Sequence, residues 1–270
     1  MKKIVTIIAS LVLTVALALP ATAQHYVGVK GGYGSSDVRL YPAWKTPMSL
    51  GMLSGGLVWR YYSAATAAQP SLKYTGGISV ELQYLQRGYK HESLTNENHT
   101  YSRRINSLMM PLIWQPHISF ADERLRLFLN LGVTFSYNLS STYRTYTTET
   151  GETVEEGKYD MLLVRDNRWG YGLCGGAGAE VKLAGRVSLF VEGRYDFGYS
   201  DILKAQTKYP PNTFQRSPMD NITLSVGVFY RLSGGEDSSQ MRRRAERVAA
   251  DTIDSLDSPN TFELSKKEKR

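Results

Sequence analysis

Long stretches of this chain alternate between apolar residues and polar or small ones, which is the pattern of β-strands. The clearest case is the pair of segments 168–183 and 187–200, separated by the turn Ala184-Gly185. One face of each segment is apolar and ends in aromatic residues, and the other face combines glycines with charges. Each segment is long enough to cross a bilayer, which takes about 9–11 tilted strand residues. The pair therefore predicts a membrane-spanning hairpin.

The apolar face of such strands is expected to contact lipid, and the face with glycines and charges is expected to line the interior of a barrel. Glycine makes room in a crowded interior for bulky charged side chains that reach across from other strands. Alternation is also compatible with a soluble lipocalin-type barrel, whose apolar face points inward. With lipid outside, Leu131→Arg should cost about 2–4 kcal/mol, and Asn130→Ser, which faces inward, should be mild.

Six further segments show the same alternation, at about residues 25–34, 53–62, 76–89, 103–115, 124–139 and 221–232. The pattern slips near Leu85, which predicts a bulge or the edge of the membrane. Pro111 lies inside the fourth segment and predicts a local distortion, because proline cannot donate to the strand ladder. The sequence thus predicts an all-β fold: an eight-stranded antiparallel up-and-down transmembrane β-barrel.

The connections between these strands differ in length. They are long after the first, third, fifth and seventh strands and shorter after the second, fourth and sixth, although the connection 63–74 is longer than usual for a short turn. Outer-membrane barrels have long extracellular loops and short periplasmic turns, so we expect both termini in the periplasm. A soluble barrel has no reason to sort its connections in this way.

The two ends of the chain differ from the barrel segment 24–232. Residues 1–23 combine Lys2-Lys3, an apolar run and the small-residue site Ala21-Thr22-Ala23, which is the organisation of a secretory signal peptide; a membrane-anchor helix is the alternative. No other long apolar run follows. Residues 233–270 form a charged tail, and the Ala-rich, charged stretch 238–256 indicates that it is part helical. The tail is either a solvated periplasmic segment or a helix that docks on a partner or on the barrel rim.

Charge and reactive side chains change this picture little. The net charge of +7 is spread over strands and loops, with a basic cluster only in the tail, so nucleic acid is not expected as a partner. The single Cys174 cannot form an internal disulfide. The four histidines, His25, His91, His99 and His117, show neither metal-ligand spacing nor a recognisable triad. We therefore expect no catalytic residue, no metal and no cofactor, and interpret the protein as a non-enzyme.

Charged residues on the inward face should form a paired network, because an unpaired buried charge is costly. An eight-stranded barrel has an interior that side chains just fill, so the network is interpreted as structural filling, with a gate or an ion path as the alternative. Its predicted members are Lys30, Arg60, Glu81, Arg126, Glu180, Lys182, Glu192, Arg194, Asp196 and Arg231.

Five segments, taken in order, resemble the PorT-like outer-membrane β-barrel family of the Bacteroidetes. They are ELQYLQRGYK (81–90), MMPLIW (109–114), LFLNLGVTFSY (127–137), GYGLCGGAGAEV (170–181) and VEGRYDFGYSDIL (191–203), and the resemblance covers about residues 24–232. The last predicted strand also looks like the terminal signal read by the barrel-assembly machinery, with Ser225, Gly227, Tyr230 and Leu232 as its residues. In most such proteins that strand ends the chain, whereas here a tail follows.

The resemblance implies fold and location more than function. It implies an outer-membrane protein with a structural or interaction role, linked to envelope or secretion assembly, because the founding member serves export through the type IX system. The partners it implies are outer-membrane lipid, the barrel-assembly machinery, and envelope or secretion proteins reached through loops or the tail. A narrow channel for small solutes and a lipid-modifying enzyme remain as alternatives.

Overall fold

A computed structural model of the 270-residue chain describes residues 24–41, 48–62, 74–93, 98–120, 124–204, 216–233 and 246–248. The predicted signal peptide, 1–23, lies outside the described residues, as does most of the tail. Residues 246–248 are helical. Among the described residues, no helix has the length and apolar character needed to cross a membrane. The strands are β1 (Gln24–Val38), β2 (Met48–Tyr62), β3 (Tyr74–Glu92), β4 (His99–Phe120), β5 (Leu125–Thr147), β6 (Thr153–Tyr159), β7 (Trp169–Ala184), β8 (Val187–Asp201) and β9 (Pro218–Ser233).

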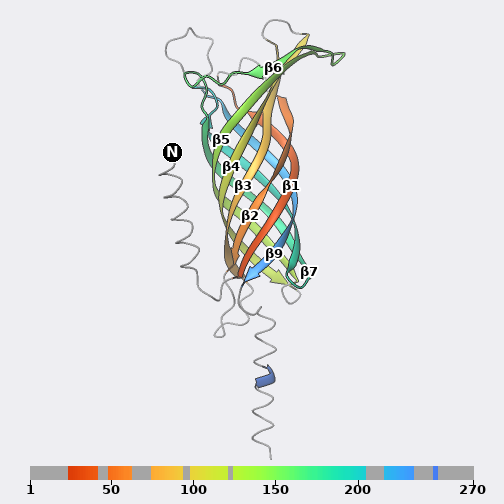
Figure 1. The fold of residues 1–270 in the computed structure, drawn as a ribbon, viewed down its shortest axis with the longest axis vertical. Helices are drawn as coiled ribbons and strands as arrows, with labels where there is room; N and C mark the ends of the chain where they lie inside the picture. Colours follow the sequence, from red (N-terminus) through yellow and green to blue (C-terminus); the bar gives the residue numbers. More distant parts are fainter. Residues whose placement is uncertain are drawn as a thin grey trace, which may run out of the picture.

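These strands close into a barrel (Figure 1). Each strand is antiparallel to its neighbours, and the sheet closes because β1 pairs with β9 while β4 pairs with β5. β6 pairs with β5 outside this ring, so the ring consists of β1 to β5 and β7 to β9. The predicted eight-stranded antiparallel transmembrane barrel is confirmed.

The two ends of the barrel differ. We call the end with Gln24, the β7–β8 turn and Ser233 the terminal end, and the opposite end, which bears β6, the loop end (Figure 1). β4 and β5 contain 22 and 23 residues, about twice what a bilayer requires. They continue past the barrel at the loop end, where β6 joins them in a three-stranded projection.

The predicted ends of several strands were therefore wrong at the loop end. The sequence predicted that the fifth strand ends at residue 139 and that a polar connection runs to 167, but β5 continues to Thr147 and β6 follows. Thr and Tyr have high strand propensity, and outside the membrane a strand can be polar on both faces, so the apolar alternation that marks a spanning strand is missing there. The strands β1, β2, β3 and β4 are also longer at the loop end than predicted, so the loops that connect them there are shorter.

The predicted sorting of connections holds only in part. The connection β2–β3 at the terminal end covers residues 63–73 and is longer than 39–47 and 93–98 at the loop end. The other half of the chain follows the prediction, with short turns 121–124 and 185–186 at the terminal end. The lengths of the connections alone therefore do not tell which end of the barrel bears the long loops.

Apolar side chains cover the outside, and the inside is buried. On β5, Leu131 is 49% exposed on the outer wall while the adjacent Asn130 is 0% exposed inside. The same alternation holds along the other membrane-level strands, and the lipid-facing residues include Val29, Leu57, Ile78, Leu112, Leu173, Leu189 and Leu224. The predicted assignment of faces is confirmed.

Irregularities occur near both predicted positions, together with one that the sequence did not reveal. The β2–β3 register shifts between the pairs Ser49–Tyr89 and Ser54–Leu85, but the extra residue lies in β2, and β3 keeps its alternation past Leu85. The β3–β4 pairing is interrupted beside Pro111, between Val80–Leu112 and Gln83–Met109, without a change of register. A further shift in β4–β5 leaves Leu139 as an extra residue between Ser140 and Asn138. From Leu139 onward the outward face of β5 passes from odd to even residue numbers.

Several inward glycines make room for aromatic rings. The Phe128 ring occupies the space that a Cβ on Gly178 would fill, and the Phe190 ring does the same at Gly227. The expectation that glycine accommodates charged side chains was thus incomplete. With Tyr26, Val58, Tyr62 and Phe229, these two rings form an apolar layer inside the terminal half of the barrel.

Candidate functional site

A closed ring of ion pairs lies at the centre of the lumen. Lys30 Nζ is 2.8 Å from Glu81 Oε2 and 2.6 Å from Glu192 Oε1. Arg194 donates to the same two carboxylates, with Nη1 at 2.8 Å from Glu81 Oε2 and Nη2 at 2.8 Å from Glu192 Oε1. The four side chains come from β1, β3 and β8 and are all buried. Two cations and two carboxylates thus balance each other across the barrel.

A second group of charges lies among the aromatic rings. Arg60 is fully buried, with Nη1 at 3.6 Å from Glu180 and Nη2 at 3.9 Å from Glu192. Arg126 Nη1 is 3.3 Å from Glu180. The Arg60 guanidinium also lies 4.2 Å from the ring centre of Phe229, and other rings surround it at the distances of cation–π contacts. Aromatic faces therefore contribute to stabilising this charge, whose Nε has no hydrogen-bond partner among the described residues.

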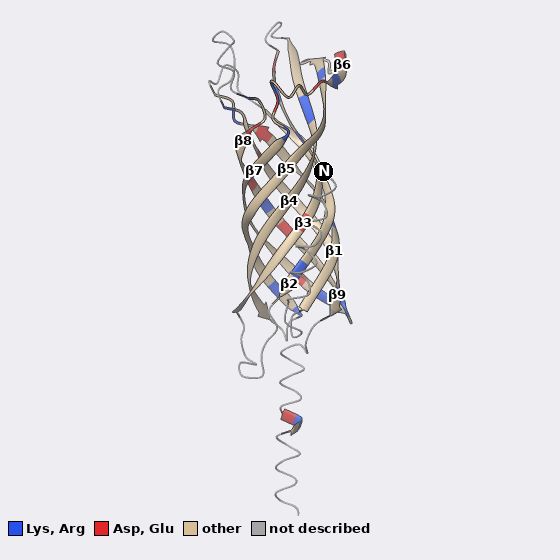
Figure 2. Cartoon of the chain, turned by 60° about the vertical axis from the view of Figure 1, so that its left-hand side comes forward, with Lys and Arg blue, Asp and Glu red and all other residues tan. Residues whose placement is uncertain are grey.

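Seven of the ten predicted network residues meet in these ion pairs. Asp196 is buried one step closer to the loop end, and its Oδ1 has no hydrogen-bond partner among the described residues. Lys182 and Arg231 lie half-buried toward the terminal end, outside the central ring. Figure 2 shows how charged residues of both signs follow one another along the strands.

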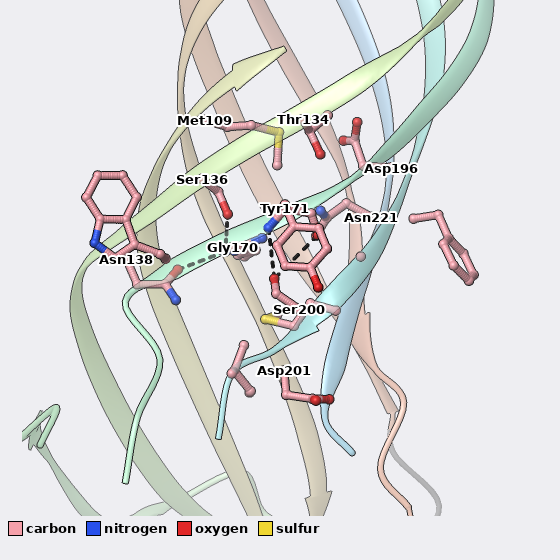
Figure 3. A pocket seen from close by; sticks show the side chains of 16 residues that line it. Met109, Thr134, Ser136, Asn138, Gly170, Tyr171, Asp196, Ser200, Asp201 and Asn221 are labelled. Atoms are coloured by element: carbon pink, nitrogen blue, oxygen red, sulfur yellow. Dashed lines mark hydrogen bonds between the residues drawn. The ribbon is translucent and has the colours of Figure 1, made fainter. Parts of the chain in front are cut away.

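Beyond Asp196, the described residues line a small cavity in the lumen. Its volume is about 20 Å³, and Arg87, Met109, Thr134 and Asp196 are among the residues that line it (Figure 3). This is room for about one water molecule. Arg87 is buried here and donates to Ser107 Oγ on the neighbouring strand β4 at 3.0 Å and to Asn138 Oδ1 on β5 at 2.8 Å. Buried side chains of the described residues thus occupy the barrel interior from the aromatic layer to Arg87.

A folded cap closes the loop end. Asp166 is 1% exposed, and its Oδ1 accepts a hydrogen bond from the equally buried Arg103 at 3.1 Å. The backbone N–H of Asn167 donates to the carbonyl of Ile202 at 3.0 Å, which fastens the segment 160–167 to the connection after β8. Under it lies an apolar cluster of Val38, Leu40, Tyr89, Ile105, Ile202 and Met219.

The sequence did not single out three of these charged residues. Arg87 and Arg103 lie within the predicted strands 76–89 and 103–115 and have the inward parity of those strands, so alternation would have identified both. Asp166 follows no periodic pattern and could be placed only by the fold.

Two tyrosines of the projection have shifted acidity. Burial raises the pKa of the Tyr159 hydroxyl, and the neighbouring Arg103 opposes this shift. The hydrogen bond that Tyr143 donates to Glu155 Oε1, at 2.7 Å, raises the pKa of that hydroxyl. Both side chains therefore stay neutral hydrogen-bond donors at physiological pH.

The histidines and the cysteine have structural surroundings. His91 and His99 lie in β3 and β4 rather than in a loop, and His91 is stacked between Tyr89 and Tyr101. His117 packs inside the barrel against Tyr62, and Cys174 is buried and free. Within the described residues, no group of three or more His, Cys, Asp or Glu side chains could hold a metal ion.

The residues of the predicted assembly signal lie on the closing strand β9. Tyr230 and Leu232 point outward, whereas Ser225 is buried inside. Gly227 pairs with Lys30 of β1 and Phe190 of β8, so the strand joins the first and the penultimate strands of the ring. Recognition by the assembly machinery stays a prediction.

Comparison with protein families identifies one match. The sequence profile of a family described as "Outer membrane protein beta-barrel domain" matches residues 23–204. This range contains β1 to β8 and the central ring of ion pairs. No curated protein sequence matches the chain.

Solved structures with a similar fold include several outer-membrane proteins. A major outer membrane protein from Thermus thermophilus has 14% identity and a TM-score of 0.45, covering 78% of this chain and 99% of that one. OprG from Pseudomonas aeruginosa has 12% identity and a TM-score of 0.40, with 79% and 98% covered. Ail of Yersinia pestis, solved with the heparin analogue sucrose octasulfate, has 14% identity and a TM-score of 0.36, with 77% and 99% covered. Likeness at this level carries no argument about activity.

Proposed function

Since this chain belongs to the outer membrane protein beta-barrel domain family, we propose that it is an interaction protein of the bacterial outer membrane that works through its loop end. The channel and the lipid-modifying enzyme are the competing functions. In this proposal the loop end faces the cell exterior and the termini face the periplasm. The resemblance to PorT-like proteins supports a link to envelope or secretion assembly.

The filled lumen is the observation that carries this proposal. A channel needs a continuous aqueous path, but ion pairs, aromatic rings and Arg87 occupy the barrel interior, and the cavity beside Arg87 is only about 20 Å³. The Arg103–Asp166 pair holds a further layer across the loop end. Such an interior favours a rigid support for a surface outside the membrane.

The projection of β4, β5 and β6 is the surface that this support presents. It extends a regular sheet beyond the barrel (Figure 1), and β6 is an edge strand whose residues Thr153–Glu156 are exposed. Ordered strands hold side chains in fixed positions, which lowers the entropic cost of binding a partner.

Epitope insertion at two matched turns tests the orientation. Gly151 lies at the tip of the projection and Gly185 in the β7–β8 turn, and a side chain at either position would meet nothing within 4 Å. A peptide epitope inserted at Gly151 should be labelled by antibody on intact cells, and one at Gly185 only after the outer membrane is permeabilised. The reverse pattern would overturn the proposed orientation.

Shortening the projection tests the interaction role. Arg144 and Glu156 are paired, so an Asn-Gly turn can replace residues 145–155 and keep the hairpin. The barrel should keep its heat-modifiable gel mobility but lose a partner that cross-links to the wild-type chain on cells. Conductance of the wild-type protein in planar bilayers would support the channel instead, and altered lipid A mass on deletion of the gene would support the enzyme.

A further inference from the structure

The outer wall of the loop end contains a groove lined by basic side chains. Its volume is about 650 Å³, and Lys90, Arg104 and Arg144 line it together with a single carboxylate, Glu156. This volume is within the range of pockets that hold small-molecule ligands. The basic residues come from β3, β4 and β5, the strands that continue beyond the barrel.

Strand register places these residues next to one another. Lys90 is paired with Ser102, Ser102 with Arg144, and Arg144 with Glu156, so one row crosses four strands. Arg104 lies in the adjacent row, opposite Gly88. Paired side chains on one face of a sheet lie about 5 Å apart, so a single ligand can reach the three cations together.

Two irregularities shape the groove. The extra residue Leu139 brings Arg144 onto the outward face. The Cδ2 atom of Leu50 lies where a Cβ on Gly88 would be, so an apolar side chain fills the position beside Arg104.

These cations have no carboxylate partners in the described part of the chain, unlike the cations of the central ring. The side chains of Lys90 and Arg104 make no hydrogen bond or ion pair with a described residue. Arg144 donates from Nε to the uncharged Thr153 Oγ1 at 2.9 Å. The groove thus has an uncompensated positive charge that is open to a ligand.

The groove begins just above the lipid-facing band. On β4 the last large apolar residue of the outer wall is Leu108, and Arg104 lies four residues farther along. That is about 13 Å along the strand and less along the membrane normal, because barrel strands tilt. A lipid whose acyl chains contact the band would place its headgroup in the groove.

We propose that this groove binds the phosphate groups of lipopolysaccharide in the outer leaflet. The argument for this occupant is charge complementarity together with continuity of the groove and the lipid-facing wall. Arginine and lysine form strong charge-assisted hydrogen bonds with phosphate oxygens. The placement in the outer leaflet rests on the proposed orientation of the loop end, whereas binding by the purified protein does not depend on it.

The test compares two charge-matched double variants of the full mature chain in detergent. Lys90→Gln with Arg104→Gln removes two groove cations, and Arg124→Gln with Arg186→Gln removes two exposed cations at the terminal end. Native mass spectrometry with added lipopolysaccharide measures the apparent Kd. At about 1 kcal/mol for each basic residue, the groove variant should bind about 30-fold more weakly, while the control binds as wild type does. Heat-modifiable mobility establishes that both variants are folded.

A second lipid separates phosphate recognition from general lipid contact. Dephosphorylated lipopolysaccharide should bind wild type as weakly as intact lipopolysaccharide binds the groove variant. Equal affinity of wild type and groove variant for intact lipopolysaccharide, or no effect of dephosphorylation, would overturn the proposal. A third outcome would favour an acidic protein partner and overturn the proposal: the groove variant binds polyglutamate more weakly than wild type does, but binds lipopolysaccharide equally well. Failure of the epitope experiment would leave these affinities unchanged, so the two proposals fail separately.

Discussion

Glu192 shows how strongly single residues of the lumen depend on one another. Its carboxylate contacts Lys30, Arg194 and the amide of Asn130, and lies 3.9 Å from Arg60. Glu192→Gln would leave this group of cations with less compensating charge. Breaking a buried ion pair by removing one partner costs about 3–5 kcal/mol, so the variant should unfold at clearly lower urea concentration in detergent.

On a gel run without boiling, the folded and unfolded forms of a heat-modifiable barrel give separate bands. Their ratio at each urea concentration gives the unfolding midpoint. Glu149→Gln is the matched control, because Glu149 is exposed near the tip of the projection. Its midpoint should equal that of wild type. A midpoint for Glu192→Gln within error of the control would show that the central ring contributes nothing measurable to stability.

On the lipid-facing wall, Leu131→Arg remains the sharpest single test. Leu131 points outward within the apolar run of β5 between Leu127 and Leu139, so an arginine there should cost about 2–4 kcal/mol and reduce assembly into the outer membrane. Leu131→Val keeps the surface apolar and should assemble normally. Equal assembly of the two variants would mean that residue 131 does not contact lipid.

The structure changes the expectation for the neighbouring inward residue. From sequence, Asn130→Ser seemed a mild exchange, but Asn130 accepts a hydrogen bond from Gln115 at 2.5 Å and donates one to Glu192 at 3.1 Å. A serine side chain is too short to keep both partners, and unsatisfied buried groups cost about 1–3 kcal/mol each. Parity gives the face of a residue, whereas its partners across the lumen depend on strand stagger.

Among the elements, the cap segment 160–167 depends on one buried carboxylate. Asp166 accepts hydrogen bonds from Arg103 and from the backbone N–H of Leu162. Asp166→Ala should release the segment from the barrel. Because local unfolding exposes the backbone to proteases, trypsin should then cut after Arg165 at a higher rate. The control is Asp160→Ala, at an exposed residue of the same segment, which trypsin should cut at the wild-type rate. Equal cleavage rates for the two variants would refute the role of Asp166.

How well each element could be predicted follows from the environment that shaped it. A strand between lipid and a packed lumen has to alternate between apolar outward residues and polar or small inward residues. The sequence therefore predicted the eight ring strands and pointed to the irregularities near Leu85 and Pro111. β6, the bulge at Leu139 and the cap lie where water or other loops surround the chain, and no such constraint acts there. The central ring was predicted as a set of charges, but its pairing, Lys30 with Glu81 and Glu192, follows from closure.

For the whole molecule, ring closure separates the barrel from the tail. The β1–β9 pairing that closes the barrel ends at Ser233. A mature chain truncated after Ser233 should therefore assemble and keep the urea midpoint of the longer chain, while any partner of the predicted tail is lost. A lower midpoint in detergent would show that residues after 233 stabilise the barrel itself.

The central ring of ion pairs also bears on how the barrel can form. Lys30 belongs to the first strand and Glu192 to the seventh strand of the ring, 162 residues apart in sequence. In a partly built sheet Lys30 can pair only with Glu81, and Arg194 only with Glu192 on its own strand, so each of the four groups lacks one of its two partners. Charged groups with incomplete partners are unfavourable at membrane depth. The remaining pairs, Lys30 with Glu192 and Arg194 with Glu81, form only when β1, β3 and β8 face one another across the lumen, so closure of the barrel completes the neutralisation of its interior.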